Sequence, residues 1–186
     1  VGLGNPGSNY TNTRHNIGFK IIDAINAHFK LSKQKPKFKG LLTTGNIDEK
    51  KIYAIKPLTF MNNSGTAIKE LIDYFKIDAK DVFVFHDDLD IDFGKIKAKF
   101  GGSSAGHNGI ESIDKFIGKD YSRVRIGIGH PKQKKKVNNH VLEDFKEDEE
   151  EKINEISENI VKQLPTLIGK KIDLFSSKVN QDLNGI

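Results

Sequence analysis

The chain has 186 residues and no cysteine, which excludes disulfides, thiolate nucleophiles and thiolate metal ligands, and its length favours one domain, residues 1–186, with a sizeable core. No apolar run approaches the ~20 residues needed to cross a bilayer, and no charged leader precedes a short apolar segment, so we expect a cytoplasmic protein without a membrane partner. The 30 Lys and Arg against 25 Asp and Glu give a formal net charge of +5, which favours a polyanionic partner, although solubility alone would also explain it.

The first stretch of the chain is a loop rich in glycine, proline and asparagine, followed by a helix. Val1 is not a methionine and already looks like the end of a strand, so we expect further residues upstream. Apolar residues at helical spacing predict a helix from about His15 to about Phe29. Because the glycines leave little side-chain bulk in the loop, we expect Asn5 to lie near His15.

The same loop formally matches the dinucleotide-binding fingerprint, with glycines at positions 2, 4 and 7. That fingerprint requires a helix directly after its third glycine and an acidic residue at the end of the next strand. Here Pro6 and the polar residues 8–13 separate the glycines from the helix, and Asp23, the nearest acid at a suitable distance, falls inside that helix. The sequence therefore argues against nucleotide binding.

The rest of the chain alternates between strand and helix patterns. The predicted strands are residues 41–47, 51–56, 81–88, 95–100 and 123–128. The predicted helices run from a cap at residue 63 or 64 to about 75, over 110–117 and over 147–168, with a helical or frayed tail to 186. The connecting segments are a basic connector (32–39), two turn-rich loops (57–65 and 101–109) and a basic loop (132–136).

These elements predict an α/β fold. Strands 41–47 and 51–56 are separated by a short polar turn and should form an antiparallel hairpin. Residues 81–88 are apolar on both faces, as expected of a central strand. We therefore expect a single-domain three-layer sandwich, with a mixed, mostly parallel sheet enclosed by helices.

A candidate catalytic site lies where the central strand ends. His86, Asp87 and Asp88 come at its carboxyl end, the edge at which α/β sheets place their ligands. A carboxylate there can accept from one nitrogen of an imidazole such as His15 and keep the other nitrogen basic. The alternative is a divalent metal held by Asp87, Asp88 and Asp90, although consecutive strand residues point to opposite faces. No serine lies in a nucleophile elbow, so water is the expected attacking group.

Amide and basic side chains supply further candidates. Amides can grip a peptide unit or stabilise an oxyanion without charge, although ordinary turn chemistry also explains loop asparagines. The candidate amides are Asn5, Asn62, Asn63 and Asn108. Lys97, Lys99 and Arg125, with residues 132–136, offer cations for phosphates, although a solvated surface has the same composition.

Six separated motifs stand out in the sequence. They are Val-Gly-Leu-Gly-Asn-Pro-Gly, Thr-Arg-His-Asn-Ile-Gly-Phe, Thr-Phe-Met-Asn-Asn-Ser-Gly, His-Asp-Asp-Leu-Asp, Gly-His-Asn-Gly and Arg-Ile-Gly-Ile-Gly-His-Pro. In this order they closely resemble the bacterial-type peptidyl-tRNA hydrolase family, over almost the whole chain and less clearly after about residue 144. The resemblance implies a single α/β domain with a mixed sheet enclosed by helices.

The resemblance also implies an activity, a partner and a location. Members of this family cleave the ester that links a peptide, or an N-blocked aminoacyl group, to the 3′ end of tRNA, which recycles tRNA released prematurely from ribosomes. They use no metal or other cofactor, are usually monomers and are cytoplasmic. The expected partner is peptidyl-tRNA, bound through its acceptor stem and 3′ CCA end.

Roles for individual residues follow from the same resemblance. His15 is similar to the family's catalytic base, Asp87 to the carboxylate that orients it, and Asn5 to the residue that recognises the substrate's peptide group. The expected cleft and 3′-end contacts are Tyr10, Phe60, Met61, Asn62, His107 and Asn108, and the expected contacts with acceptor-stem phosphates are Lys97, Lys99 and Arg125. One departure is the loop before His107, which reads Gly-Gly-Ser-Ser-Ala-Gly instead of a glycine-dense run, so a gating motion of this loop is not implied.

Two interpretations stay open at this point. In the first, His15 takes a proton from a water that attacks the ester carbonyl, and Asp87 stabilises the developing imidazolium. In the second, the chain is a non-catalytic RNA-binding module, in which the basic strand face and a stacking Phe60 or Tyr10 bind RNA. Such modules interleave several aromatic residues with Lys or Arg on one exposed sheet face, a pattern that the sequence does not show. The first interpretation is therefore favoured.

Overall fold

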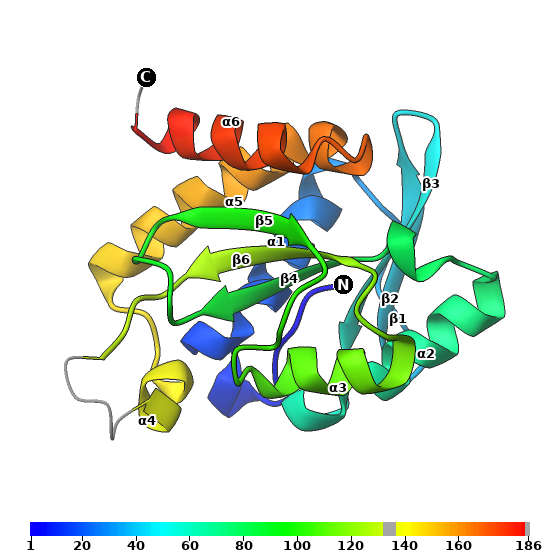
Figure 1. The fold of residues 1–186 in the computed structure, drawn as a ribbon, viewed down its shortest axis with the longest axis horizontal. Coiled ribbons are helices and arrows are strands. Elements are labelled where there is room, and N and C mark those ends of the chain that lie inside the picture. The colour runs from blue at the N-terminus through cyan, green and yellow to red at the C-terminus, as the bar shows by residue number, and fades with distance from the viewer. Residues whose placement is uncertain (132–136, 185–186) are drawn as a thin grey trace.

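The computed structural model describes residues 1–131 and 137–184, in which helices alternate with strands (Figure 1). The strands are β1 (Lys35–Lys37), β2 (Gly40–Ile47), β3 (Lys50–Pro57), β4 (Phe83–Asp88), β5 (Ile96–Phe100) and β6 (Ser122–Gly127). The helices are α1 (Ile17–His28), α2 (Ser64–Phe75), α3 (Asn108–Ile117), α4 (Val137–Leu142), α5 (Glu147–Ile168) and α6 (Ile172–Asn184). Short 3-10 turns are η1 (Ser8–Tyr10), η2 (Arg14–Asn16), η3 (Met61–Asn63) and η4 (Ala79–Asp81).

The strands form two three-stranded sheets that the first residues of the chain join. One sheet has the order β1-β2-β3 and the other the order β4-β6-β5. The backbone of residues 1–3 lies parallel to β4, where the N–H of Leu3 donates to the carbonyl oxygen of Phe85 at 3.0 Å. On its other side, the N–H of Gly2 donates to the carbonyl oxygen of Ile55 in β3 at 3.1 Å. The result is a continuous mixed sheet with β4 near its centre.

The α/β class, the mixed sheet and the antiparallel hairpin are confirmed, but the expectation of a mostly parallel sheet is wrong. Among the described strands, β4 and β6 pair in parallel, whereas β1 with β2, β2 with β3 and β5 with β6 pair antiparallel. The hairpin turns through Asp48 and Glu49, whose φ angles of 45° and 63° match the right-handed twist of the two strands. Strand direction depends on tertiary connections, which local sequence patterns do not show.

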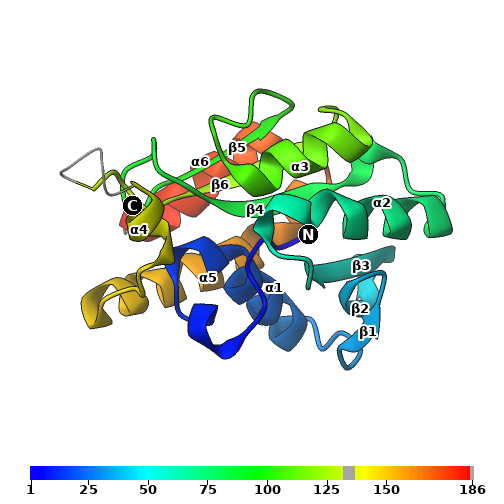
Figure 2. The same ribbon diagram turned by 90° about the horizontal axis from the view of Figure 1, so that it is seen from below.

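Helices cover both faces of the sheet, as expected of a three-layer sandwich (Figure 2). Neighbouring residues of β4 point into different cores. Phe85 packs with residues of α1 and α5, and Val84 packs with residues of α2 and α3. None of the described helices is long and apolar enough to cross a membrane.

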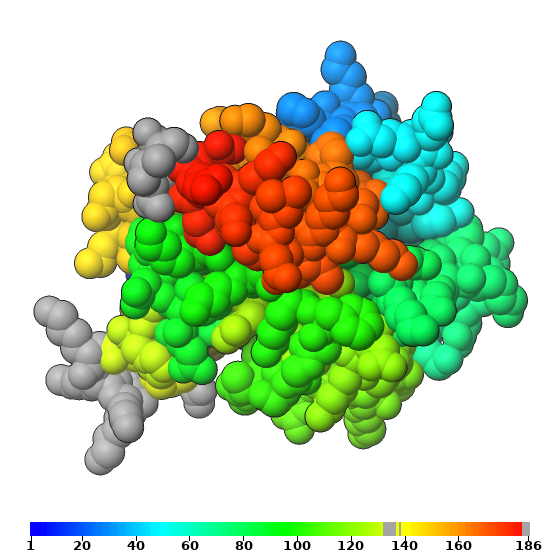
Figure 3. All heavy atoms as spheres, turned by 45° about the horizontal axis from the view of Figure 1, so that its top comes forward, coloured from blue at the N-terminus to red at the C-terminus, as the bar shows by residue number. Residues whose placement is uncertain are grey.

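Helix α6 closes the free edge of β5. The side chain of Asn180 accepts from the N–H of Ile96 at 3.0 Å and donates to its carbonyl oxygen at 2.7 Å, and the hydroxyl of Ser176 accepts from the N–H of Ala98 at 2.8 Å. In the space-filling view, α6 lies directly over this part of the molecule (Figure 3). The predicted tail is thus a helix that protects an edge strand from pairing with other chains.

A close approach between α1 and the sheet brings the start of the helix to the end of β4. A side chain at Gly18 would collide with the backbone of Leu3 and with the carbonyl oxygen of Phe85. Only glycine therefore lets α1 lie this close to the strands. His15, about one turn before Gly18, is therefore also held close to the sheet.

Several elements differ from their prediction. Lys35–Lys37, expected in a connector, form the edge strand β1, and Val137–Leu142 form the unpredicted helix α4. The β1 sequence of two lysines around a proline is not typical of a strand, so its three residues gave no strand signal. The six residues of α4 are too few to show a clear helical period. The basic loop predicted over 132–136 lies outside the described residues.

Candidate active site

His15 and Asp87 meet at the carboxyl end of β4, although 72 positions separate them in the sequence. The 3-10 turn η2 presents His15, whose Nδ1 lies 2.9 Å from both carboxylate oxygens of Asp87. Because a carboxylate can only accept, Nδ1 carries the proton and Nε2 is left as the basic nitrogen. Nε2 has no hydrogen-bond partner among the described residues and is not enclosed by them.

Burial and mutual attraction shape the acid–base behaviour of this pair. Burial alone would lower the pKa of His15, but the negative charge and hydrogen bond of Asp87 outweigh it and raise that pKa. Burial alone would raise the pKa of Asp87, but the charges and hydrogen bonds of His15 and His107 outweigh it and lower that pKa well below its usual range. The carboxylate is therefore ionised beside His15 near neutral pH.

A second imidazole binds the same carboxylate. Nε2 of His107 lies 3.0 Å from Oδ1 of Asp87, and the ring centroids of His107 and His15 are 4.9 Å apart. Nδ1 of His107 accepts the backbone N–H groups of Gly109 and Ile110 and so caps α3. The sequence motif Gly-His-Asn-Gly identified His107 but gave no sign of its contact with Asp87.

These three side chains form a cluster that could attract a metal ion, since their ligand atoms all lie within 4.8 Å of one another. The hydrogen bonds argue against that use. A neutral His107 whose Nδ1 accepts from α3 must carry its proton on Nε2, the atom that faces Asp87. Ligation through Nε2 would require Nδ1 to become protonated and would cost α3 its cap. The cluster thus fits a proton-handling site better than a metal site.

The carboxylates of the alternative metal site are also engaged elsewhere. Oδ2 of Asp88 accepts from Nε of Arg125 at 2.7 Å, and Oδ1 of Asp90 lies 2.9 Å from Nε2 of His130. Neither belongs to the cluster around Asp87. The three aspartates therefore do not converge on one ion.

Asn5 is bonded to Asn16, the residue after His15, and keeps one side-chain donor free. Its Oδ1 accepts from the N–H of Met61 at 2.8 Å, and its backbone N–H and carbonyl oxygen bond the side chain of Asn16 at 2.8 and 2.9 Å. Nδ2 of Asn5 has no hydrogen-bond partner in the part of the chain that the structure describes, and it is not enclosed. The amide therefore presents N–H donors outward. Sequence reasoning missed Asn16, although it directly follows His15 in the second motif.

The other expected cleft residues differ in exposure. Phe60 is 57% exposed, and Asn62 in the middle of η3 and Asn108 at the start of α3 are also exposed. Tyr10 is half-buried at the end of η1. Met61 is buried in the core between the sheet and α2, so its contribution to the site is the backbone N–H that holds Asn5.

The expected phosphate-binding cations lie together on one sheet face. Lys97 of β5 is opposite Arg125 of β6, and Lys99 is opposite Arg123. Burial and then the nearby Arg125 and Arg123 lower the pKa of Lys99, which shows that the cations are close enough to repel one another. Arg123 is buried and bonds Asp114 at 2.7 Å, whereas Lys97 is exposed. Lys97, Lys99 and Arg125 thus form a basic face beside the site.

Arg14, the residue before His15, connects the turn η2 to residues 143–149. It is buried, its Nη2 donates to Oε2 of Glu149 at 2.7 Å, and its guanidinium lies 5.6 Å from the centre of the Phe145 ring. Its backbone N–H donates to the carbonyl oxygen of Glu143 at 3.0 Å. The turn that carries His15 is therefore anchored to residues from α4 onward.

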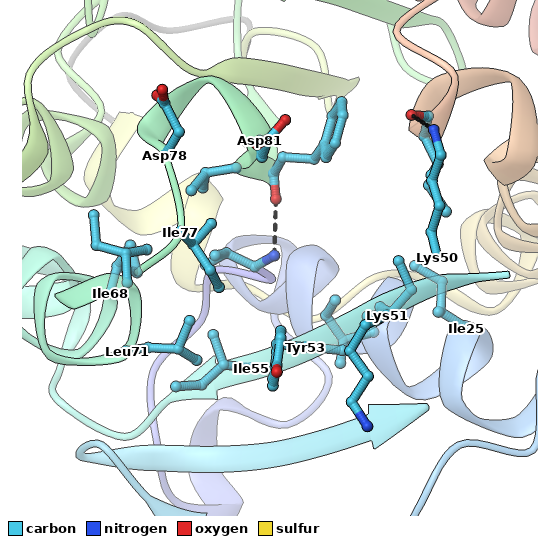
Figure 4. A pocket seen from close by; sticks show the side chains of 18 of the residues that line it. Ile25, Lys50, Lys51, Tyr53, Ile55, Ile68, Leu71, Ile77, Asp78 and Asp81 are labelled. Atoms are coloured by element: carbon cyan, nitrogen blue, oxygen red, sulfur yellow. Dashed lines mark hydrogen bonds between the residues drawn. The ribbon is translucent and has the colours of Figure 1, made fainter. Parts of the chain in front are cut away.

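Two cavities lie outside the His15 cluster. One, of about 580 Å³, lies at the opposite end of the sheet and is lined mainly by apolar residues, among them Ile55, Ile68 and Leu71 (Figure 4). The other, of about 630 Å³, borders Asn5 and Asn16 and is also lined by residues of α1, β2, β3 and α5. Neither is lined by His15, Asp87 or His107.

An α/β fold with a carboxylate-bound imidazole and an outward-facing amide at the carboxyl edge of its sheet carries groups suited to a hydrolytic enzyme. Comparisons with known proteins agree. The model of the family described as peptidyl-tRNA hydrolase matches residues 1–185.

Individual relatives resemble the chain over nearly its whole length. The chain is 72% identical over 180 residues to the peptidyl-tRNA hydrolase of Pelagibacter ubique (strain HTCC1062), with 97% of each covered. It is 46% identical over 181 residues to that of Bartonella quintana (strain Toulouse), with 97% of this chain and 94% of the relative covered. The crystal structure of peptidyl-tRNA hydrolase from Acinetobacter baumannii matches with a TM-score of 0.90 at 34% identity, covering 97% of this chain and 92% of that one. The chain belongs to the peptidyl-tRNA hydrolase family.

Proposed function

We propose that this chain hydrolyses the ester of peptidyl-tRNA in a single catalytic domain, with His15 as the general base. The observation that carries the assignment is the position of His15, whose Nδ1 donates to both oxygens of Asp87 while Nε2 faces outward without a partner among the described residues. The family supplies the substrate: hydrolysis of peptidyl-tRNA is the activity for which it is named. The proposed reaction uses no metal.

The proposed reaction has two proton transfers. Nε2 of His15 takes a proton from a water as the water oxygen bonds the ester carbonyl carbon, and Asp87 stabilises the imidazolium that forms. The imidazolium then returns a proton to the 3′ oxygen of the tRNA as the bond from carbonyl carbon to that oxygen breaks. The products are a free carboxyl group on the peptide and a free hydroxyl on the tRNA.

The amides around His15 are proposed to hold the peptide. Nδ2 of Asn5 presents free N–H donors, which suit a peptide carbonyl oxygen, and its orientation is fixed by the N–H of Met61. Asn62 and Asn108 are exposed and can supply further hydrogen bonds to the peptide or to the oxyanion. A site that recognises the peptide unit through uncharged amides would accept many peptide sequences.

The tRNA is proposed to bind along the basic face. Lys97, Lys99 and Arg125 would contact acceptor-stem phosphates, while the exposed ring of Phe60 and the half-buried Tyr10 would contact the 3′ CCA end. Action as a monomer in the cytoplasm belongs to the same proposal.

The experiment is single-turnover cleavage of an N-blocked aminoacyl-tRNA with excess protein. His15→Ala should lose about 10³-fold or more in rate while still binding the tRNA, and His28→Ala, a change at an exposed histidine of α1, should cleave at the wild-type rate. A His15→Ala variant that cleaves like the wild type would remove His15 from its role. Cleavage by the wild type in the presence of a chelator separates this mechanism from a metal-dependent one, and absence of cleavage with intact binding would point to an RNA-binding module.

A further inference from the structure

His107 joins helix α3 to the carboxylate of Asp87. Its Nδ1 accepts the backbone N–H groups of Gly109 at 3.1 Å and Ile110 at 3.3 Å, and its Nε2 lies 3.0 Å from Oδ1 of Asp87. Because Nδ1 serves as an acceptor, the neutral ring carries its proton on Nε2. The helix cap thereby makes His107 a fixed donor to Asp87.

Oδ1 of Asp87 accepts from two imidazoles at once. It lies 2.9 Å from Nδ1 of His15 and 3.0 Å from Nε2 of His107. A second donor on one carboxylate withdraws part of its negative charge, which leaves less to stabilise an imidazolium at His15. The two histidines therefore compete for one acceptor.

The other ionisable groups near the pair do not compete in the same way. His86 of β4 lies behind His107, with ring centroids 4.9 Å apart, and donates from Nδ1 to the carbonyl oxygen of Asp87 at 2.7 Å. Burial and then the neighbouring His107 lower the pKa of His86 to about 3, so its ring is neutral near pH 7. Arg123 of β6 bonds Asp114, and Arg14 of η2 bonds Glu149. Among the described residues, Asp87 is thus the charged group that acts on His15, and His107 shares its carboxylate.

We propose that His107 is a positioning residue that limits how tightly Asp87 holds a proton on His15, and so keeps His15 in its basic form near neutral pH. The inference rests on the proposed role of His15. Both ring nitrogens of His107 are engaged by described residues, and its side chain is 10% exposed, so a hydrogen bond from His107 to substrate would have to replace one of the bonds that it makes here.

The test separates the two roles of the His107 side chain, which are donating to Asp87 and capping α3. In His107→Asn and His107→Ser the new side chain can still accept from the N–H groups of α3, because both residues are good N-caps, but it is too short to reach Asp87. The His15 pKa would be measured by NMR titration of the imidazole, and the pH dependence of kcat/KM would be measured in parallel. His130→Asn is the matched control, since it removes an exposed histidine that pairs with Asp90 and does not belong to the cluster of His15, Asp87 and His107.

In both His107 variants the His15 pKa should rise by about one unit, and the acidic limb of the kcat/KM profile should move to higher pH by the same amount. At pH values well above the acidic limb, kcat/KM of both variants should stay within about tenfold of the wild-type value. His130→Asn should move neither quantity. Folded variants with an unchanged His15 pKa would overturn the inference and leave the role of His15 intact. A change in the His15 pKa without any change in the pH dependence of kcat/KM would instead speak against His15 as the base.

Discussion

Asn5 and Asn16 exchange two hydrogen bonds that lock the loop at the start of the chain to the turn that carries His15. The backbone N–H of Asn5 donates to Oδ1 of Asn16 at 2.8 Å, and Nδ2 of Asn16 donates to the carbonyl oxygen of Asn5 at 2.9 Å. Asn16 is buried and directly follows His15. One side chain therefore sets the position of the proposed peptide-binding amide relative to the proposed base.

Replacing this side chain should damage both stability and catalysis. Asn16→Ala leaves the buried N–H and carbonyl oxygen of Asn5 without partners, which should cost about 3 kcal/mol in the free energy of unfolding. Because Asn5 and His15 lose their fixed separation, kcat/KM should fall by about 100-fold. Urea unfolding and steady-state kinetics on an N-blocked aminoacyl-tRNA measure the two effects. Asn154→Ala, at an exposed position of α5, is the control, and equal behaviour of the two variants would show that the pair has no such role.

His86 should make the folded chain sensitive to acid. Its pKa is lowered by burial, and then by His107, to about 3, whereas an unfolded chain binds a proton on histidine near pH 6.5. Between these values the unfolded state binds more protons, so the free energy of unfolding should fall by roughly 1 kcal/mol for each pH unit below 6.5. The raised pKa of His15 acts in a different window: its contribution is complete below pH 6.5 and is lost as the pH rises through its folded value.

The measurement for His86 is the free energy of unfolding from pH 4 to 7. In His86→Asn the slope over this range should be shallower than in the wild type, because the titrating ring is gone. His28→Asn, which changes an exposed histidine of α1, should keep the wild-type slope. A His86→Asn curve that runs parallel to the wild type would mean that other groups control acid unfolding.

The basic face should carry the salt dependence of tRNA binding. In the double variant Lys97→Ala with Lys99→Ala, affinity should fall, and the slope of log affinity against log salt should become shallower by about two, near one for each phosphate that no longer has a lysine beside it. The control is Lys33→Ala with Lys35→Ala, two exposed lysines at and before the edge strand β1. Equilibrium binding at several salt concentrations distinguishes them. If the control pair changed the slope and the Lys97 pair did not, the tRNA phosphates would instead bind near β1, at the other end of the sheet.

The sequence predicted the parts of the fold that have strong local signals. Helix α5, the hairpin of β2 and β3, and the buried strand β4 were recognisable because each repeats its pattern over several residues. Strand β1 and helix α4 were missed because each is short, and β1 is basic and contains Pro36. The direction of the strands depends on which elements become neighbours, which no single segment encodes.

For the site, sequence reasoning identified the residues and the structure supplied their contacts. The motifs pointed to His15 and Asp87, and the structure brings the two together. They gave no sign that His107 shares the carboxylate or that Asn16 holds Asn5, because these contacts arise when separate loops meet at the end of β4. The roles of these residues in the reaction stay predictions until the variants above are measured.

The burial of Arg14 against the later part of the chain has a consequence for biosynthesis. A ribosome that has made residues 1–131 has already produced His15, Asp87, Asn5 and the basic face, but not Glu143, Phe145 or Glu149, the groups that hold Arg14 in place. Since the N-terminus is made first, the turn that bears His15 is held in place only once residues 143–149 have been made. The contact between His15 and Asp87 is therefore fixed later in translation than the synthesis of either residue.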